Sequence, residues 1–156
     1  MKKVFAKEII WVVAAIAWTC FIWGNSLQTA AESSETSRGI LAMITPILEQ
    51  TGIPEEFWHT LIRKAAHMAE FAMLGILWSV GLVKKECTVW KRLCLVLVIC
   101  LATAAVDETI QLFVPGRSGE LRDICIDFVG GTLGVLMPAI PMAKKRKPFE
   151  GGKREA

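Results

Sequence analysis

Charged and hydrogen-bonding side chains interrupt an otherwise apolar sequence at three places. Two of them are RKAAHMAEF, beginning at Arg63, and DETIQLF, beginning at Asp107. At 100° per residue, Arg63, His67 and Glu70 fall within about 60° of one helix face. Asp107 and Gln111 also share a face. Each segment therefore predicts a helix that carries one polar stripe.

The third polar segment is RDICIDFVGGTLG. On a helix, Asp123, Asp127, Gly130 and Gly134 occupy one narrow arc. The two glycines form a G-x-x-x-G pattern, which allows two membrane helices to approach closely. We therefore predict a carboxylate pair next to a helix-packing surface, although the glycines alone are equally consistent with packing and no site.

These segments contain groups with two kinds of chemistry. Four cations have the charge to hold a phosphate, and arginine has a planar fork that suits it: Arg63, Lys64, Arg117 and Arg122. Six groups can act as acids, bases or metal ligands: His67, Glu70, Asp107, Glu108, Asp123 and Asp127. The sequence leaves the metal and any cofactor unassigned. A purely structural alternative pairs Arg63 with Asp107 or Asp123, and Arg117 or Arg122 with Glu108, so that helix ends are clamped together.

Long apolar segments surround these groups. The chain of 156 residues is 53% hydrophobic, which exceeds the usual share for a soluble domain. Four segments approach the ~20 residues that a membrane-spanning helix needs: 9–23, 65–83, 93–106 extended toward 114, and 124–142. We found no phosphate-binding glycine loop, nucleophile elbow, zinc spacing or nucleic-acid motif.

The basic residues predict the orientation of the spans. Thirteen of the 18 Lys and Arg residues lie in the N-terminal tail, in the loop 84–92 and in the C-terminal tail. Because positive charge concentrates on the cytoplasmic side, both termini should be cytoplasmic. The expected fold is thus an all-α membrane protein with four transmembrane helices, and the three polar segments meet at its external face.

The first external loop should contain a helix of its own. Apolar residues recur at helical spacing between Glu35 and Glu49, which predicts a short amphipathic helix on the membrane surface. Pro54, followed by two glutamates, then marks the start of a helix that continues into the second span. We expect an integral membrane domain over residues 1–143 and a basic, disordered cytoplasmic tail over residues 144–156.

The same motifs resemble those of the VanZ-like family. The resemblance rests on RKAAHMAEFAMLG, on DETIQLFVPGRSGELRD and on IDFVGGTLG, with a weaker match at SLQTAAESSETS. It covers nearly the whole chain between the tails. Many relatives have asparagine where this chain has Asp127. The resemblance implies a small protein of the bacterial plasma membrane, and it links the family's namesake to low-level resistance to the lipoglycopeptide teicoplanin.

Two functions follow as hypotheses. In the first, the external cavity binds an anionic, lipid-linked cell-envelope molecule and limits access by a glycopeptide antibiotic. In the second, a membrane enzyme acts on a lipid headgroup or envelope polymer, with His67 and Glu70 as acid–base groups and Asp107, Glu108 or Asp123 as base or metal ligand. Lipid transport ranks behind both, because the cytoplasmic halves of the spans are almost purely apolar.

Overall fold

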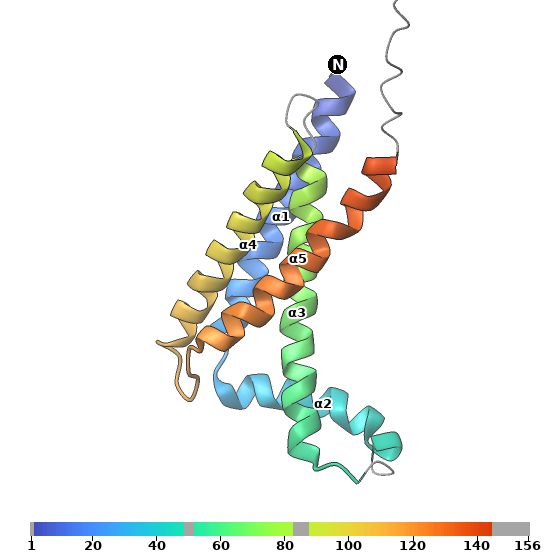
Figure 1. Ribbon diagram of the computed structural model, residues 1–156. Coiled ribbons are helices and arrows are strands. Elements are labelled where there is room, and N and C mark those ends of the chain that lie inside the picture. Colours follow the sequence, from blue (N-terminus) through green and yellow to red (C-terminus); the bar gives the residue numbers. More distant parts are fainter. Residues whose placement is uncertain (1, 49–51, 83–87, 145–156) are drawn as a thin grey trace, which may run out of the picture.

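The computed structural model describes residues 2–48, 52–82 and 88–144, and it places five helices there (Figure 1). They are α1 (Lys2–Ser26), α2 (Ala30–Leu48), α3 (Glu55–Gly81), α4 (Val89–Gln111) and α5 (Leu121–Lys144). No strand occurs in these three ranges, so the predicted all-α class is confirmed. Residues 84–87 of the predicted basic loop 84–92, and residues 145–156 of the predicted basic tail 144–156, lie outside the described residues.

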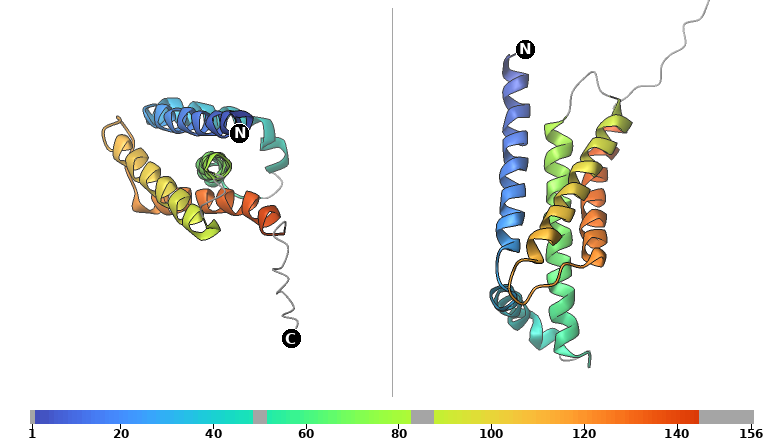
Figure 2. Two further views of the ribbon diagram at one scale, coloured as in Figure 1. Left: turned by 90° about the horizontal axis from the view of Figure 1, so that it is seen from above. Right: turned by 90° about the vertical axis from the view of Figure 1, so that its left-hand side faces the viewer.

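Four of the helices form a bundle. Viewed along its axis, α3 lies between α1 on one side and α4 and α5 on the other (Figure 2). The most extensive packing joins α3 to α5. The start of α1 and the end of α5 lie at the same end of the bundle (Figure 1). We call the opposite end, where α1 and α4 finish and α5 begins, the polar end.

The helix α2 crosses the polar end and packs on the first turns of α3 (Figure 1). It begins at Ala30, several residues before the predicted start at Glu35. A capping box explains this start: Thr29 Oγ1 accepts from the Glu32 amide at 3.4 Å, and the Glu32 carboxylate accepts from the Thr29 amide at 2.8 Å. The bonds from the Thr29 amide and hydroxyl lower the pKa of Glu32.

Removing this cap should loosen the start of α2. We expect Thr29→Ala to cost about 1 kcal/mol of local stability and to speed amide exchange in the first turn of α2. Because the folded pKa of Glu32 is lowered, the carboxylate cap is intact near neutral pH and is lost as the pH falls through that pKa. Hydrogen exchange followed by mass spectrometry measures both effects. Thr36→Ala is the matched control, because that hydroxyl bonds only the Glu32 carbonyl within the helix; equal exchange in the two variants would contradict the cap.

The helix α3 begins where the sequence predicted. Pro54 precedes its first residue, and Glu55 and Glu56 occupy its first turn, where the helix dipole favours acids. At 1.5 Å per residue, its 27 residues extend about 40 Å. This length lets α3 contact α2 with its first turns and still pass through the bundle, so it carries Arg63 and His67 at the polar end.

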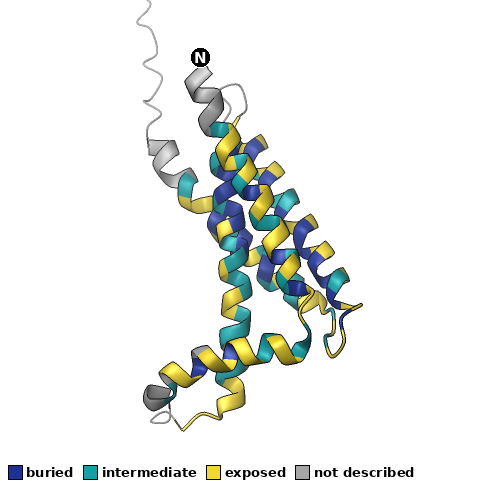
Figure 3. Cartoon of the chain, turned by 180° about the vertical axis from the view of Figure 1, so that it is seen from behind, coloured by how far each residue is buried: buried dark blue, intermediate teal, exposed yellow. Residues whose placement is uncertain are grey.

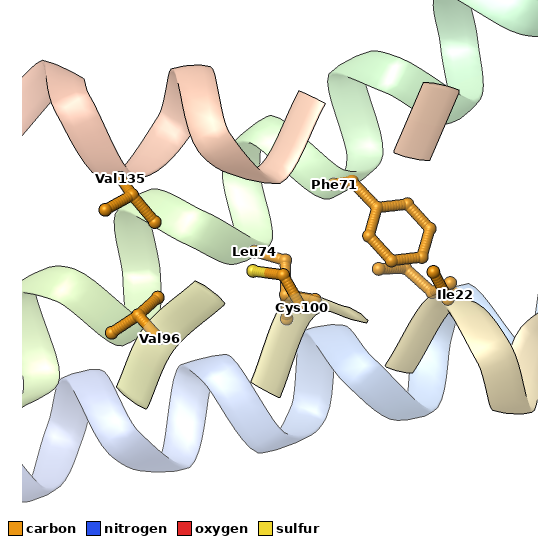
Figure 4. Close-up of a cluster of buried hydrophobic side chains, with 7 residues drawn as sticks. Ile22, Phe71, Leu74, Val96, Cys100 and Val135 are labelled. Atoms are coloured by element: carbon orange, nitrogen blue, oxygen red, sulfur yellow. The ribbon is translucent and has the colours of Figure 1, made fainter. Parts of the chain in front are cut away.

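Apolar residues of all four bundle helices meet in one core (Figure 4). Its fully buried members include Ile22 of α1, Phe71 of α3, Val96 of α4 and Val135 of α5. The outer surfaces of the helices are exposed (Figure 3), and many of the exposed side chains are large and apolar, such as Val98. Since lipid tails are as apolar as these side chains, close packing stabilises such a bundle more than removal from water does.

Two of the helices meet length and composition criteria for crossing a membrane. They are residues Glu8–Ser26 of α1 and all of α4, with mean hydropathies of 1.6 and 2.2. The other two bundle helices, α3 and α5, have 27 and 24 residues but are not among these candidate spans. Among the described residues, the apolar composition therefore identifies two candidate spans, compared with four expected from the sequence.

Glycines allow α3 and α5 to cross with their backbones in contact. A methyl group added at Gly130 would overlap the carbonyl oxygen of Met68, and one added at Gly134 would overlap that of Ala72. Gly131 in turn lies against Cys100 of α4. The G-x-x-x-G segment thus lies at the α3–α5 crossing, one turn beyond Asp127 and toward the opposite end of the bundle.

Candidate functional site

A tight turn and a buried carboxylate shape the loop between α4 and α5. The Arg117 amide donates to the Val114 carbonyl at 3.2 Å, and Gly116 has φ of 77°, as position i+2 of a type II turn requires after Pro115. The Glu108 carboxylate then accepts from the Glu120 amide at 2.9 Å. Glu108 therefore holds the loop against the end of α4 at the point where α5 begins.

A polar cavity lies beneath this loop. Its volume of about 60 Å³ is enough for about four water molecules. The lining is almost entirely polar and comes from α3, α4, the loop and α5: Arg63, His67, Gln111, Gly116, Arg117, Ser118, Glu120 and Asp123. Three segments that are distant in the sequence therefore contribute to one cavity.

The two acids of the cavity already have cationic partners. Asp123 pairs with Lys64, and Glu120 pairs with Arg122 at 3.4 Å. The pairing differs from the expected structural clamps, because Lys64, and not Arg63, holds Asp123, while Arg122 stays 70% exposed beside Glu120.

The two arginines of the cavity differ from its two acids in their ion pairing. In the described part of the chain, neither Arg63 nor Arg117 makes an ion pair with a carboxylate. Arg117 donates one long hydrogen bond, of 3.4 Å, to the Gln28 carbonyl. Burial, and secondly the charge of Arg63, lower the pKa of Arg117, although a guanidinium stays protonated. The cavity thus brings together two positive groups whose hydrogen-bonding capacity is largely unused.

Below the cavity, Asp107 is completely buried within a hydrogen-bond network. Ser26, the last residue of α1, donates to Asp107 Oδ1 at 2.7 Å. Gln111 donates to Asp107 Oδ2 at 2.9 Å and to Glu108 Oε1 at 3.3 Å. This network joins the ends of α1 and α4 and fixes the orientation of the Asp107 carboxylate.

His67 connects this network to α5. Its Nδ1 lies 3.9 Å from Oδ1 of Asp127, whose side chain is 1% exposed. Asp127 Oδ2 accepts no hydrogen bond from any residue that the structure describes. His67, Asp107 and Asp127 each offer one atom that could bind a metal ion, and these three atoms lie within 4.8 Å of one another. The three side chains, from three helices, therefore form a compact cluster that we call the His–Asp cluster.

The comparisons with known proteins identify the family. The sequence pattern of the VanZ/LLP1 family matches residues 11–140. The chain belongs to the VanZ/LLP1 family. The predicted VanZ-like resemblance is thereby confirmed, and the apolar helices agree with a VanZ-like membrane protein. No curated protein and no solved structure matches the chain.

Not every predicted site residue of this VanZ-like protein reaches the cavity. Arg63, His67, Gln111, Arg117 and Asp123 line it. Glu70 instead accepts from Asn25 Nδ2 of α1 at 3.0 Å. Asp107 and Asp127 are buried next to the cavity. Glu108 bonds to the loop that covers it. Lys64 and Arg122 form ion pairs with the two acids that line it.

Sequence reasoning missed the part that α1 plays. Asn25 and Ser26 end the first apolar segment and bond to Glu70 and Asp107, so four bundle helices contribute to the polar end, and not three. The signal was present, because two adjacent small polar residues at the end of an apolar helix lie at the same membrane depth as the acids. Glu120 was missed as a lining residue because it stands in the loop, outside any helical stripe.

Proposed function

We propose that this VanZ-like protein spans the bacterial plasma membrane four times, with both termini in the cytoplasm and the polar end at the external face. The distribution of Lys and Arg supports the orientation. The four bundle helices have 23 to 27 residues, or about 35 to 40 Å, which is enough to cross ~30 Å of hydrocarbon. In this orientation the cavity opens at the depth of the lipid headgroups.

The cavity binds the phosphate of an anionic, lipid-linked cell-envelope molecule in this proposal. A single observation carries it: Arg63 and Arg117 line one cavity and have no carboxylate partner among the described residues, while the two acids of the cavity are already paired. A guanidinium forms strong, bidentate hydrogen bonds with phosphate. A phosphate would also relieve the repulsion between the two arginines.

Binding is favoured over catalysis by the positions of the acids. Of the five catalytic candidates, only His67 and Asp123 line the cavity, and Lys64 pairs with Asp123. The carboxylates of Glu70, Asp107 and Glu108 accept hydrogen bonds from within the protein. We therefore propose a binding protein, and we assign it no reaction.

The direct test uses two lipids that differ only in phosphate. The full chain, in detergent micelles, is mixed with polyprenyl phosphate or with the matching polyprenol, and complexes are counted by native mass spectrometry. The proposal predicts preferential retention of the phosphate form. Equal retention of the two lipids would overturn it.

Reduced antibiotic susceptibility would follow if the bound molecule is the target of a glycopeptide. A bacterial host that expresses the chain should then need more teicoplanin for growth inhibition than one that expresses Arg63→Gln/Arg117→Gln at equal membrane levels. Equal susceptibility of these two strains would contradict the resistance role. Equal susceptibility would not contradict phosphate binding, which the comparison of the two lipids tests separately.

A further inference from the structure

The His–Asp cluster has the composition of a metal site. An imidazole and two carboxylates are ligands that first-row divalent metals accept, and three protein ligands with further positions open are typical of zinc centres. Mg²⁺ and Ca²⁺ prefer sites made of oxygen alone, so a histidine ligand favours a transition ion. From these residues we propose that His67, Asp107 and Asp127 bind one divalent transition-metal ion, of the Zn²⁺ or Mn²⁺ class.

Distances within the cluster suit this assignment. Ligand atoms that are 2.0–2.2 Å from a tetrahedral ion lie about 3.3–3.6 Å from one another. The three potential ligand atoms of the cluster lie within 4.8 Å of one another, and His67 Nδ1 lies 3.9 Å from Asp127 Oδ1. The last distance is too long for a hydrogen bond and exceeds the tetrahedral range by about 0.3–0.6 Å. Contractions of at most about 1.5 Å, within reach of small side-chain rotations, would complete the ligand set.

Asp127 provides independent evidence for a ligand. Its side chain is 1% exposed, and Oδ2 has no hydrogen-bond donor among the described residues. A buried carboxylate oxygen without a partner is costly, and more so in a protein surrounded by lipid. A metal ion bound by the Asp127 carboxylate would compensate for the burial of this group, and its charge of +2 would balance the two carboxylates beside a neutral histidine.

Asp107 already has the support that metal ligands receive in proteins. Ser26 donates to one of its oxygens and Gln111 to the other, and each oxygen keeps a second lone pair. Hydrogen bonds of this kind orient ligating carboxylates, and their removal typically weakens metal binding 10- to 100-fold. The network that joins α1 to α4 would therefore also position a metal ligand.

Metal binding by the untagged full chain tests this inference in the absence of any lipid phosphate. The protein is purified in detergent, stripped with a chelator and dialysed against Zn²⁺ or Mn²⁺, and bound metal is measured by mass spectrometry. We expect about one ion per chain. His67→Gln and Asp127→Asn should each weaken binding by about tenfold or more. His59→Gln is the matched control, because His59 lies on the same helix but contacts α2 through the Ser34 carbonyl. No stoichiometric binding by the folded chain, or equal binding by all variants, would overturn the site.

A second measurement identifies the metal ligands even if the two site variants fail to fold. The chain has two histidines, so His59→Gln leaves His67 as the only imidazole. X-ray absorption of this variant loaded with Zn²⁺ should show one histidine nitrogen together with oxygen ligands. A spectrum with sulfur, or with oxygen alone, would contradict the proposed ligands. The metal-site proposal and the phosphate-site proposal can be refuted independently. Metal binding is measured without lipid, and phosphate-lipid binding can be measured with or without metal.

Discussion

Gly134→Ala is expected to destabilise the folded protein by about 3 kcal/mol, near the upper end of what overpacking costs. The added methyl group overlaps the carbonyl oxygen of Ala72, which belongs to the backbone of α3 and cannot rotate away as a side chain can. The two helices must therefore separate, and the α3–α5 packing, the most extensive in the bundle, is weakened. Thermal unfolding in detergent measures the loss.

The control for this prediction is Gly24→Ala on α1. A methyl group there meets no atom within 4 Å. Since alanine favours a helix over glycine by up to about 1 kcal/mol, this variant should be unchanged or slightly more stable. The same chemical change thus has opposite effects at the two positions. If Gly134→Ala melted at or above the temperature of Gly24→Ala, the close α3–α5 crossing would be wrong.

Loss of phosphate-lipid binding is the second large effect that we expect. Because a hydrogen bond to a charged group contributes about 1.5–3 kcal/mol, Arg63→Gln and Arg117→Gln should each weaken binding of polyprenyl phosphate by about 10- to 100-fold. Arg117→Lys should recover only part of the affinity, since lysine keeps the charge but lacks the planar fork. Titration of the lipid into the purified chain measures these constants.

Arg38→Gln serves as the control for general electrostatic attraction. Arg38 is exposed on α2 and does not line the cavity. The variant loses the same charge as the cavity variants, so its affinity should match that of the unmodified chain. A loss as large as that of Arg63→Gln would show that net charge, and not the cavity, attracts the lipid.

Periodicity in the sequence predicted the parts of the site that lie on single helices. Arg63 and His67 share a stripe and line one cavity, and Asp107 and Gln111 share a face and bond to each other. These outcomes depend only on the helix repeat, which a sequence contains directly.

Partners on other helices were not predictable in the same way. Lys64 meets Asp123, and Glu70 meets Asn25, because of how α3 is rotated against α5 and α1. This rotation depends on tertiary packing, such as the glycine contacts at the α3–α5 crossing, which a helical repeat does not specify. The start of α2 was predictable in principle, because Thr29 and Glu32 have the spacing of a capping box.

We propose that the cavity beneath the α4–α5 loop holds a lipid phosphate. Photo-crosslinking can locate the bound lipid, with a polyprenyl phosphate that carries a photoreactive group beside the phosphate and with a phosphate-free analogue as the reference. If the cavity holds the phosphate, the phosphate form labels residues 111–123 or residues 63–67, and the analogue does not. Labelling confined to the opposite end of the bundle, or equal labelling by both lipids, would contradict it.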